Sequence, residues 1–343
     1  MPLDLLAPPA TSPLSLYRYR DGLYAADLLT TALVEFDLFT WLDAHPSTLA
    51  GVCARFGFHA RPADVMLTLF VARGYVERDG EVFRVSAVGR EHLTAGSPWY
   101  LAPYFGALKE RPFVQDFARV LRTGQPANWG GARSGQDWHV AMQDETFARR
   151  FTAAMDCRGL YLGEALARAV DLSNHHHVLD IGGGSGIYAC ALAARHPHLR
   201  GTVLDQAPVA PIATTLIADR GLGDRIDVVA ADFFSEALPA GHDVHLFSNV
   251  LHDWDTPEVG RLLSASFASL APGGLLLIHD AFITADKTGP IAVAEYSVLL
   301  MHASQGRCYA TSEYEEMLRA TGFVDYRYQD TVADRGVMTA RRP

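Results

Sequence analysis

The chain has 343 residues, of which 49% are hydrophobic and 20% are charged, and its formal net charge is −10. This composition supplies enough apolar side chains for a large core, which excludes disordered and fibrous proteins. No apolar run approaches the roughly 18 residues of a membrane-spanning helix, and the acidic balance disfavours nucleic-acid binding, which usually requires a basic surface.

Residues 1–16 form the first recognisable segment. They are rich in proline and lack the basic and apolar regions of a signal peptide, so we expect a flexible leader. The four cysteines, Cys53, Cys157, Cys190 and Cys308, are widely spaced and match no metal-binding pattern. They favour a reduced, cytoplasmic protein.

Residues 17–100 are predicted to form a winged-helix-like domain. Apolar residues at helical spacing predict one helix over residues 25–42. Two shorter helices are expected at 48–56 and 62–73. Asp79 and Gly80 then separate two alternating runs, which predicts a β-hairpin.

Residues 101–170 are helical around a glycine-rich stretch and are interpreted as a connector to a second domain over residues 171–343. In that domain predicted strands alternate with predicted helices. The strands are expected at 178–181, 201–205, 226–230, 244–248, 275–278, 324–328 and 337–341, and the helices at 187–195, 208–219 and 257–270. This alternation predicts a parallel sheet with helices on both faces, in which ligands bind beyond the carboxyl ends of the strands.

A glycine-rich turn follows the first of these strands. Asp180 ends the strand, and Gly182, Gly183 and Gly184 allow tight turning and close approach of a ligand. The stretch that begins at Gly184 matches the dinucleotide fingerprint G-x-G-x-x-G/A. The whole D-x-G-x-G-x-G stretch instead fits S-adenosylmethionine (SAM), whose positive charge Asp180 would face. Asp205 ends the second strand and is placed to hold the ribose of either cofactor.

Four segments, in this order and spacing, resemble the SAM-dependent O-methyltransferases. They are VLDIGGGSG (178–186), ADFF (231–234), SNVLHDWD (248–255) and LAPGGLLLIHD (270–280). The chain is most similar to the dimeric group that includes plant caffeate and acetylserotonin methyltransferases and bacterial natural-product methyltransferases. The resemblance covers nearly the whole chain, since EVFRVSAVGREHL (81–93) matches the dimerisation domain and FARRFTAAM (147–155) matches the helix before the catalytic domain.

The resemblance implies an α/β fold, with a Rossmann-like seven-stranded SAM-methyltransferase domain over residues 171–343. An all-α, winged-helix dimerisation domain over residues 17–100 would precede it and form a homodimer. The expected reaction is methyl transfer from SAM to a hydroxyl of a small aromatic or polyketide-like natural product, which leaves S-adenosylhomocysteine.

The resemblance also implies roles for individual residues. His252 stands at the position of the general base, with Asp280 as its acidic partner; Asp253 is a second candidate partner or a cap of the next helix. SAM would be held by Asp180, Gly182, Gly183, Gly184, Asp205, Gln206, Asp232, Phe233 and Ser248. Met155 and Asp253 would help to shape the acceptor pocket. No metal ion is expected, and the consecutive His175, His176 and His177 point in different directions.

Two positions depart from the plant enzymes. Cys308 stands where those enzymes have a second acidic residue beside the base, and Ser248 replaces a lysine. These differences disfavour a plant-like phenolic acceptor. They also leave an alternative in which a SAM-binding family member catalyses hydroxylation, decarboxylation or cyclisation.

Two hypotheses from other classes are less well supported. In a winged-helix transcription regulator the helix at 62–73 would present basic residues to DNA, but it carries mainly apolar ones between Arg61 and Arg73. A nicotinamide-dependent dehydrogenase is supported only by the glycine-rich turn. We therefore expect a small-molecule acceptor, with neither nucleic acid nor a membrane as a partner.

Overall fold

The computed structural model describes residues 4–127 and 141–343. Residues 1–3 of the expected leader and 128–140 of the expected connector lie outside these ranges. The chain divides into two compact units. The sheet unit comprises Met1–Leu14, Trp138–Phe282 and Thr311–Pro343, and the helical unit comprises Ser15–Asp137 and Ile283–Ala310.

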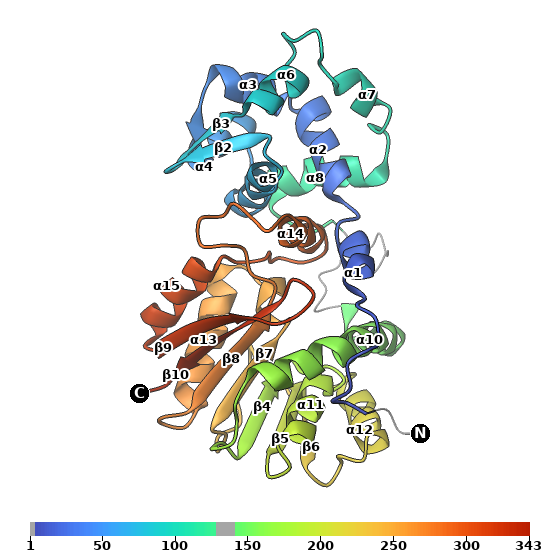
Figure 1. Cartoon of the computed structure of the whole chain (residues 1–343), viewed down its shortest axis with the longest axis vertical. Coiled ribbons are helices and arrows are strands. Elements are labelled where there is room, and N and C mark those ends of the chain that lie inside the picture. The colour runs from blue at the N-terminus through green and yellow to red at the C-terminus, as the bar shows by residue number, and fades with distance from the viewer. Residues whose placement is uncertain (1–3, 128–140) are drawn as a thin grey trace. The chain divides into compact units, whose positions relative to one another are not determined.

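A seven-stranded sheet forms the centre of the sheet unit, with strand order β6-β5-β4-β7-β8-β10-β9 (Figure 1). The strands are β4 (His177–Ile181), β5 (Arg200–Asp205), β6 (Ile226–Ala230), β7 (Val244–Ser248), β8 (Leu275–Asp280), β9 (Val324–Asp330) and β10 (Gly336–Arg341). Strands β4 to β8 pair in parallel, while β10 is antiparallel to both β8 and β9. The predicted Rossmann-like α/β class is confirmed.

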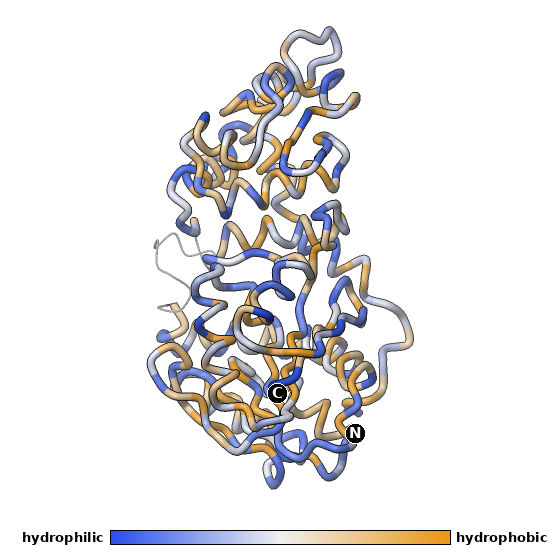
Figure 2. The backbone as a smooth tube through the Cα atoms, turned by 90° about the vertical axis from the view of Figure 1, so that its left-hand side faces the viewer, coloured by the Kyte–Doolittle hydropathy of each residue, from blue (hydrophilic) through white to orange (hydrophobic). Residues whose placement is uncertain are grey.

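Helices cover both faces of this sheet (Figure 1). They are α10 (Glu145–Ala169), α11 (Ile187–Arg195) and α12 (Ala210–Asp219) on one face, and α13 (Thr256–Ser269) and α15 (Thr311–Thr321) on the other. The central strands are apolar and buried, as Val178, Leu246 and Leu277 illustrate with no exposed area. Figure 2 shows the hydrophobic stretches that result along the backbone of this unit. Such continuous apolar runs are typical of strands covered on both sides.

Helix α10 belongs to the sheet unit because it packs closely on α11. A Cβ atom at Gly159 would lie 2.3 Å from Ile187, and one at Gly163 would lie 3.2 Å from Ala191. The two glycines therefore allow the helices to approach more closely than larger residues would. The sequence places this helix in a connector that ends at residue 170, whereas the compact unit includes it.

The helical unit contains short helices and a three-stranded sheet of order β1-β3-β2. Its elements are α1 (Leu14–Asp21), α2 (Ala25–Thr30), the π-helical turn η1 (Thr31–Glu35), α3 (Leu38–Ala44), β1 (Ser47–Thr48), α4 (Leu49–Phe56), α5 (Ala60–Ala72), β2 (Val76–Asp79), β3 (Val82–Val85), α6 (Ala87–Leu93), α7 (Ala102–Gly106), α8 (Pro112–Thr123) and α14 (Ile291–Ala303). The predicted hairpin is confirmed, with Gly80 at φ +59° in its turn. Helices α4 and α5 followed by this hairpin give the expected winged-helix plan.

The prediction of one continuous helix over residues 25–42 is wrong. The helix widens into the π turn η1, and Asp37 then adopts φ +47° before α3 begins. The Thr31 hydroxyl donates to the carbonyl of Asp27 and also lies 2.9 Å from that of Val114 on α8. Bonds of this kind bend helices, and the apolar periodicity of the sequence continues across the break unchanged.

Residues 283–310 join the helical unit although the sequence places them in the second domain. Asp64 on α5 accepts hydrogen bonds from Lys287 at 3.0 Å and from Arg307 at 2.9 Å. Arg61 also donates to the carbonyl of Gly306 at 2.8 Å. These polar contacts attach the segment around α14 to α5.

None of the helices within residues 4–127 and 141–343 is both long and apolar enough to cross a membrane.

Candidate active site

The glycine-rich turn lies between β4 and α11, as predicted, and folds around Asp180. Gly182 and Gly184 have φ values of +69° and +58°, which L-residues with side chains rarely adopt. A Cβ atom at Gly183 would lie 2.6 Å from the carboxyl carbon of Asp180. The sequence motif therefore has a direct steric cause, because alanine at residue 183 would displace the Asp180 side chain.

Asp180 itself is fully buried, and neither of its carboxylate oxygens has a hydrogen-bond partner of normal geometry within the described residues. Burial raises its pKa to about 7, the Ala189 amide acts in the opposite direction, and the charge of Asp205 adds to the rise. A buried carboxylate with so little hydrogen bonding is costly unless a cation pairs with it. The space beside Gly184 is open, with no atom within 4 Å of the position of a Cβ. The site therefore fits a cofactor that carries a positive charge, as SAM does.

Asp205 ends β5 next to this turn. Its Oδ2 accepts a hydrogen bond from the Gly184 amide at 2.8 Å, and its Oδ1 accepts one from the Gln206 amide at 2.7 Å. The Gln206 side chain in turn accepts a bond from Gln143 at 2.6 Å. Asp205 thus links the ends of β4 and β5, where the parallel register brings them side by side.

Asp232 and Phe233 follow β6, the next strand of the sheet. Phe233 is buried, and its ring lies 3.5 Å from the position that a Cβ at Gly182 would occupy, so it flanks the glycine-rich turn. Asp232 is half-buried, and its carboxylate accepts bonds from the Phe234 amide and the Ser235 hydroxyl, both at 2.9 Å. The local turn therefore holds the Asp232 carboxylate in place.

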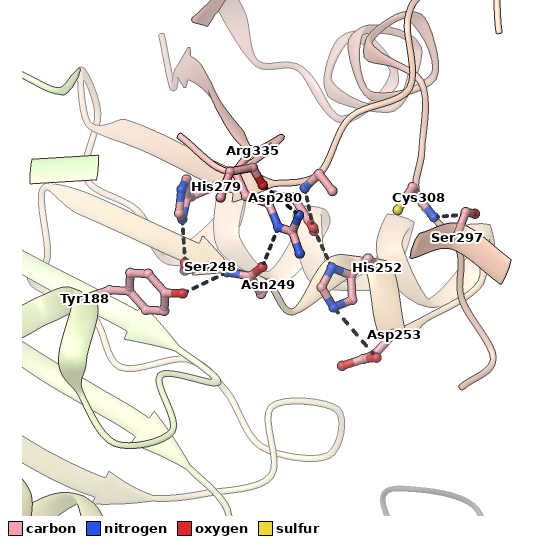
Figure 3. Close-up of polar contacts among 12 residues, drawn as sticks. Tyr188, Ser248, Asn249, His252, Asp253, His279, Asp280, Ser297, Cys308 and Arg335 are labelled. Carbon is pink, nitrogen blue, oxygen red and sulfur yellow. Dashed lines mark hydrogen bonds and ion pairs between the residues drawn. The ribbon is translucent and has the colours of Figure 1, made fainter. Parts of the chain in front are cut away.

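His252 and Asp280 come together from the ends of two neighbouring strands. His252 lies in the short 3₁₀ turn η2 (Leu251–Asp253) after β7, and Asp280 is the last residue of β8. Both are buried, and Nδ1 of His252 lies 2.5 Å from Oδ1 of Asp280 (Figure 3). Asp253 contacts the opposite nitrogen, with its Oδ1 3.9 Å from Nε2. Helix α13 is capped by Asp255, so Asp253 does not have the capping role considered for it.

The charge of Asp280 is stabilised by its surroundings. Burial alone would raise its pKa, but the contact with His252, the Ala281 amide and the charge of Arg335 together outweigh burial, and the pKa is lowered from its ordinary value. The Ala281 amide donates to the same Oδ1 at 2.7 Å, and the positive charge of Arg335 acts in the same direction. A carboxylate that accepts from Nδ1 fixes the tautomer, because the ring proton then sits on Nδ1 and Nε2 is the basic nitrogen.

A buried polar network lies beside this pair (Figure 3). The Ser248 hydroxyl bonds to Nδ1 of His279 at 2.8 Å, and Asn249 donates to the Tyr188 hydroxyl at 3.1 Å. Burial lowers the pKa of His279 to about 3, so this histidine is neutral. Arg335 donates to Asn249 at 3.4 Å. Ser248 is an expected site residue, and its hydroxyl is directed at His279.

Sequence reasoning missed Asn249 and Arg335. Asn249 lies inside the segment that contains His252, and it adopts φ +54°, which is unusual for a residue other than glycine. Arg335 is in the loop before β10, where no sequence pattern marks it.

Two further expected residues have different settings. Met155 is half-buried on α10 of the sheet unit. Cys308 belongs to the helical unit, where it is buried and its amide donates to the Ser297 hydroxyl at 3.0 Å. Within the described part of the chain no three His, Cys, Asp or Glu side chains are arranged to hold a metal ion.

Comparison with known proteins agrees with this geometry. Residues 115–324 match the family model of the O-methyltransferase domain. The 3-hydroxy-5-methyl-1-naphthoate 3-O-methyltransferase of Streptomyces sahachiroi is 33% identical over 314 residues, which cover 89% of this chain and 88% of that protein. The crystal structure of an O-methyltransferase family 2 protein from Planctomyces limnophilus, in complex with apigenin, superposes with a TM-score of 0.90 at 26% identity and covers 99% of both chains.

Some relatives have different activities, among them an N,N-dimethyltransferase and a hydroxylase. Aclacinomycin 10-hydroxylase RdmB of Streptomyces purpurascens is 35% identical over 266 residues, covering 76% of this chain and 70% of that protein. The family match and the length of these alignments nevertheless assign the chain. It belongs to the O-methyltransferase family and is a SAM-dependent O-methyltransferase.

Proposed function

We propose that this enzyme methylates a hydroxyl group of a small aromatic or polyketide-like natural product, with His252 as the general base. The observation that carries the proposal is the buried contact of 2.5 Å between His252 and Asp280 beside the cofactor turn. The naphthoate O-methyltransferase relative supports an aromatic hydroxyl as the acceptor.

The proposed cofactor site uses the carboxyl ends of β4, β5 and β6. Asp180 pairs with the positive charge of the methionine part, and Gly182, Gly183 and Gly184 let the backbone approach it. SAM supplies a methyl group on a positively charged sulfur, which is already activated for transfer. The protein therefore has to align the acceptor, and alignment in a near-attack geometry contributes about 7–11 kcal/mol in favourable cases.

The remaining cofactor contacts follow the same edge of the sheet. Asp205 and Gln206 bind the ribose, Asp232 takes the adenine amino group, and Phe233 covers the adenine ring. Ser248 supports this site through His279, to which its hydroxyl is bonded.

The second task of the protein is to remove the hydroxyl proton. A phenol with a pKa near 10 is mostly protonated at neutral pH, so a base increases the reactive fraction. Asp280 holds the proton of His252 on Nδ1, and Nε2 then takes the proton of the acceptor. Asp280 also stabilises the imidazolium that forms. General-base help of this kind is typically worth about 10²–10⁴-fold in rate.

The test is a turnover assay with 3-hydroxy-5-methyl-1-naphthoate as the probe acceptor. Formation of S-adenosylhomocysteine in equal amount to the methylated naphthoate supports the proposal. Consumption of the acceptor without S-adenosylhomocysteine would contradict methyl transfer. It would instead indicate hydroxylation, which is the activity of the hydroxylase relative, or decarboxylation or cyclisation. Met155 and Asp253 are proposed to line the acceptor site, so their alanine variants should raise KM for the naphthoate.

We also propose a homodimer formed through the helical unit. Leu16, Tyr19 and Leu23, in and just after α1, are 71%, 87% and 58% exposed, and apolar surface of this kind favours a protein interface. Sedimentation should give a dimer for the wild type and a monomer for Tyr19→Asp. The dispersed cysteines favour a reducing, cytoplasmic location, which cell fractionation tests.

A further inference from the structure

Arg335 is a buried cation beside the proposed catalytic pair. It lies in the loop between β9 and β10, is only 6% exposed, and precedes Gly336, which pairs across the sheet with Asp280. The loop holds it in an unusual conformation, because Ala333 and Asp334 have φ values of +54° and +57°. Two successive residues other than glycine in this region indicate strain, which proteins often retain at functional sites.

The guanidinium of Arg335 reaches toward the turn that carries His252. Its Nε donates to Oδ1 of Asn249 at 3.4 Å, and its NH1 donates to the carbonyl of Ala333 at 3.2 Å (Figure 3). The backbone of Asn249 is in the left-handed region at φ +54°, which asparagine adopts more readily than most residues. Its side chain is held on the other side by the Tyr188 hydroxyl at 3.1 Å. Asn249 is three residues before His252, so its conformation sets the start of η2.

The positive charge of Arg335 acts on Asp280, which forms the proposed catalytic pair with His252. Asp280 is 1% exposed, and Arg335 is among the groups that lower its pKa. Within the described residues, further charged or titratable groups around the pair include Asp253, His279 and Tyr188, and the positive charge of Arg158 acts on the last two. Burial keeps His279 neutral and raises the pKa of Tyr188, so both of these groups are uncharged at neutral pH.

We propose that Arg335 is a positioning residue for His252 and Asp280. It fixes the turn that carries His252 by holding Asn249, and its positive charge opposes the addition of a proton to the pair. This proposal rests on the proposed function, since it gives the pair the role of the base.

The sign of the charge effect is the same wherever the proton goes. A proton added to His252 creates a second cation near Arg335, and a proton added to Asp280 removes the anion that Arg335 attracts. Without the charge of Arg335 the pair therefore takes up a proton at a higher pH. A protein in which Arg335 only fills space would show no such change.

The test is a histidine-labelled NMR titration of the whole chain without acceptor, with the His252 signal assigned by its absence in His252→Gln. In Arg335→Met the titration midpoint of this signal should move up by about one pH unit. It should stay close to the wild-type value in Arg335→Lys, which keeps the charge. Arg225→Met is the matched control, because Arg225 bonds to carbonyls at the opposite edge of the sheet, such as that of Pro197.

The Asn249→Gly variant separately tests whether Arg335 positions His252 by holding Asn249. Glycine tolerates the positive φ but lacks the side-chain amide that bonds to Arg335. The variant should lower kcat with the naphthoate acceptor at least about tenfold while the His252 midpoint stays unchanged. If Arg335→Met does not fold, Arg335→Gln gives the same comparison. A wild-type midpoint in a folded charge-free variant would overturn the proposal. Because the titration needs no acceptor, this failure is distinct from failure of the methylation assay.

Discussion

Nδ1 of His252 and Oδ1 of Asp280 lie 2.5 Å apart, and both side chains are almost completely buried. The contact joins the ends of β7 and β8, which are parallel neighbours in the sheet. It fixes the tautomer of the imidazole and places a negative charge where an imidazolium would form. The glycine-rich turn and Asp180 lie at the end of β4, which is the other neighbour of β7.

The Asp280→Asn substitution should cost most of the activity. The side-chain amide of the asparagine can donate to Nδ1 of His252. The ring proton of His252 would then move to Nε2, and no basic nitrogen would face the methyl acceptor. We expect a loss of about 10²–10⁴-fold in kcat/KM, with calorimetric binding of S-adenosylhomocysteine almost unchanged. The control is Asp227→Asn, because Asp227 is exposed on the edge strand β6, whereas the His252–Asp280 pair lies at the ends of β7 and β8. Near-wild-type turnover by Asp280→Asn would refute the role of the contact.

Binding of SAM should become tighter as pH rises through 7. The pKa of Asp180 is raised to about 7 in the protein without cofactor, so the charged form that pairs with a cation becomes dominant above that pH. Calorimetric titrations at pH 6 and pH 8 measure the effect. The Asp180→Asn variant should bind SAM more weakly and lose this pH dependence. A pH dependence that persists in the variant would show that another group causes it.

The same carboxylate should reduce the stability of the protein without cofactor at alkaline pH. The folded pKa of Asp180 is above the unfolded value near 3.9, so the folded state binds more protons between these values and loses stability as pH rises through about 7. Asp180→Asn should therefore raise the melting temperature at pH 8 but not at pH 4. The control is Asp227→Asn, because Asp227 lies on β6 and its side chain is exposed. A lower melting temperature for Asp180→Asn at pH 8 would contradict burial as the cause of the raised pKa.

Much of the sheet unit was predictable because its signals are local. Each strand is a short apolar run, and the turn after β4 has a glycine wherever the backbone needs a positive φ or a side chain would strike Asp180. The contact between Asn249 and Arg335 was not predictable, since it joins residues 86 positions apart. Asn249 lies in the segment SNVLHDWD, but no sequence pattern marks Arg335 as its partner. The break before Asp37 was missed because the apolar periodicity continues through it.

Acid should destabilise the fold through buried neutral histidines. Burial lowers the pKa of His245 to about 3, and its ring bonds to the Ser266 hydroxyl at 2.9 Å. In the unfolded chain His245 takes up a proton near pH 6.5. The contribution of neutral His245 to the stability of the fold is therefore complete above that pH and is lost as pH falls toward 3. His245→Leu should make the decline in urea-unfolding free energy between pH 7 and pH 4.5 shallower. The control is His176→Leu, because His176 is exposed. An equally steep decline in His245→Leu would exclude His245 as a source.

The most direct test of the central claim compares His252→Ala with the wild type on two acceptors. One is 3-hydroxy-5-methyl-1-naphthoate, and the other is an analogue with a nitro group that ionises the hydroxyl at the assay pH. If His252 is the base, the variant should lose about 10²–10⁴-fold in kcat/KM on the first acceptor and much less on the second, which needs no base. An equal loss on both acceptors, or no loss on the first, would contradict the assignment of His252.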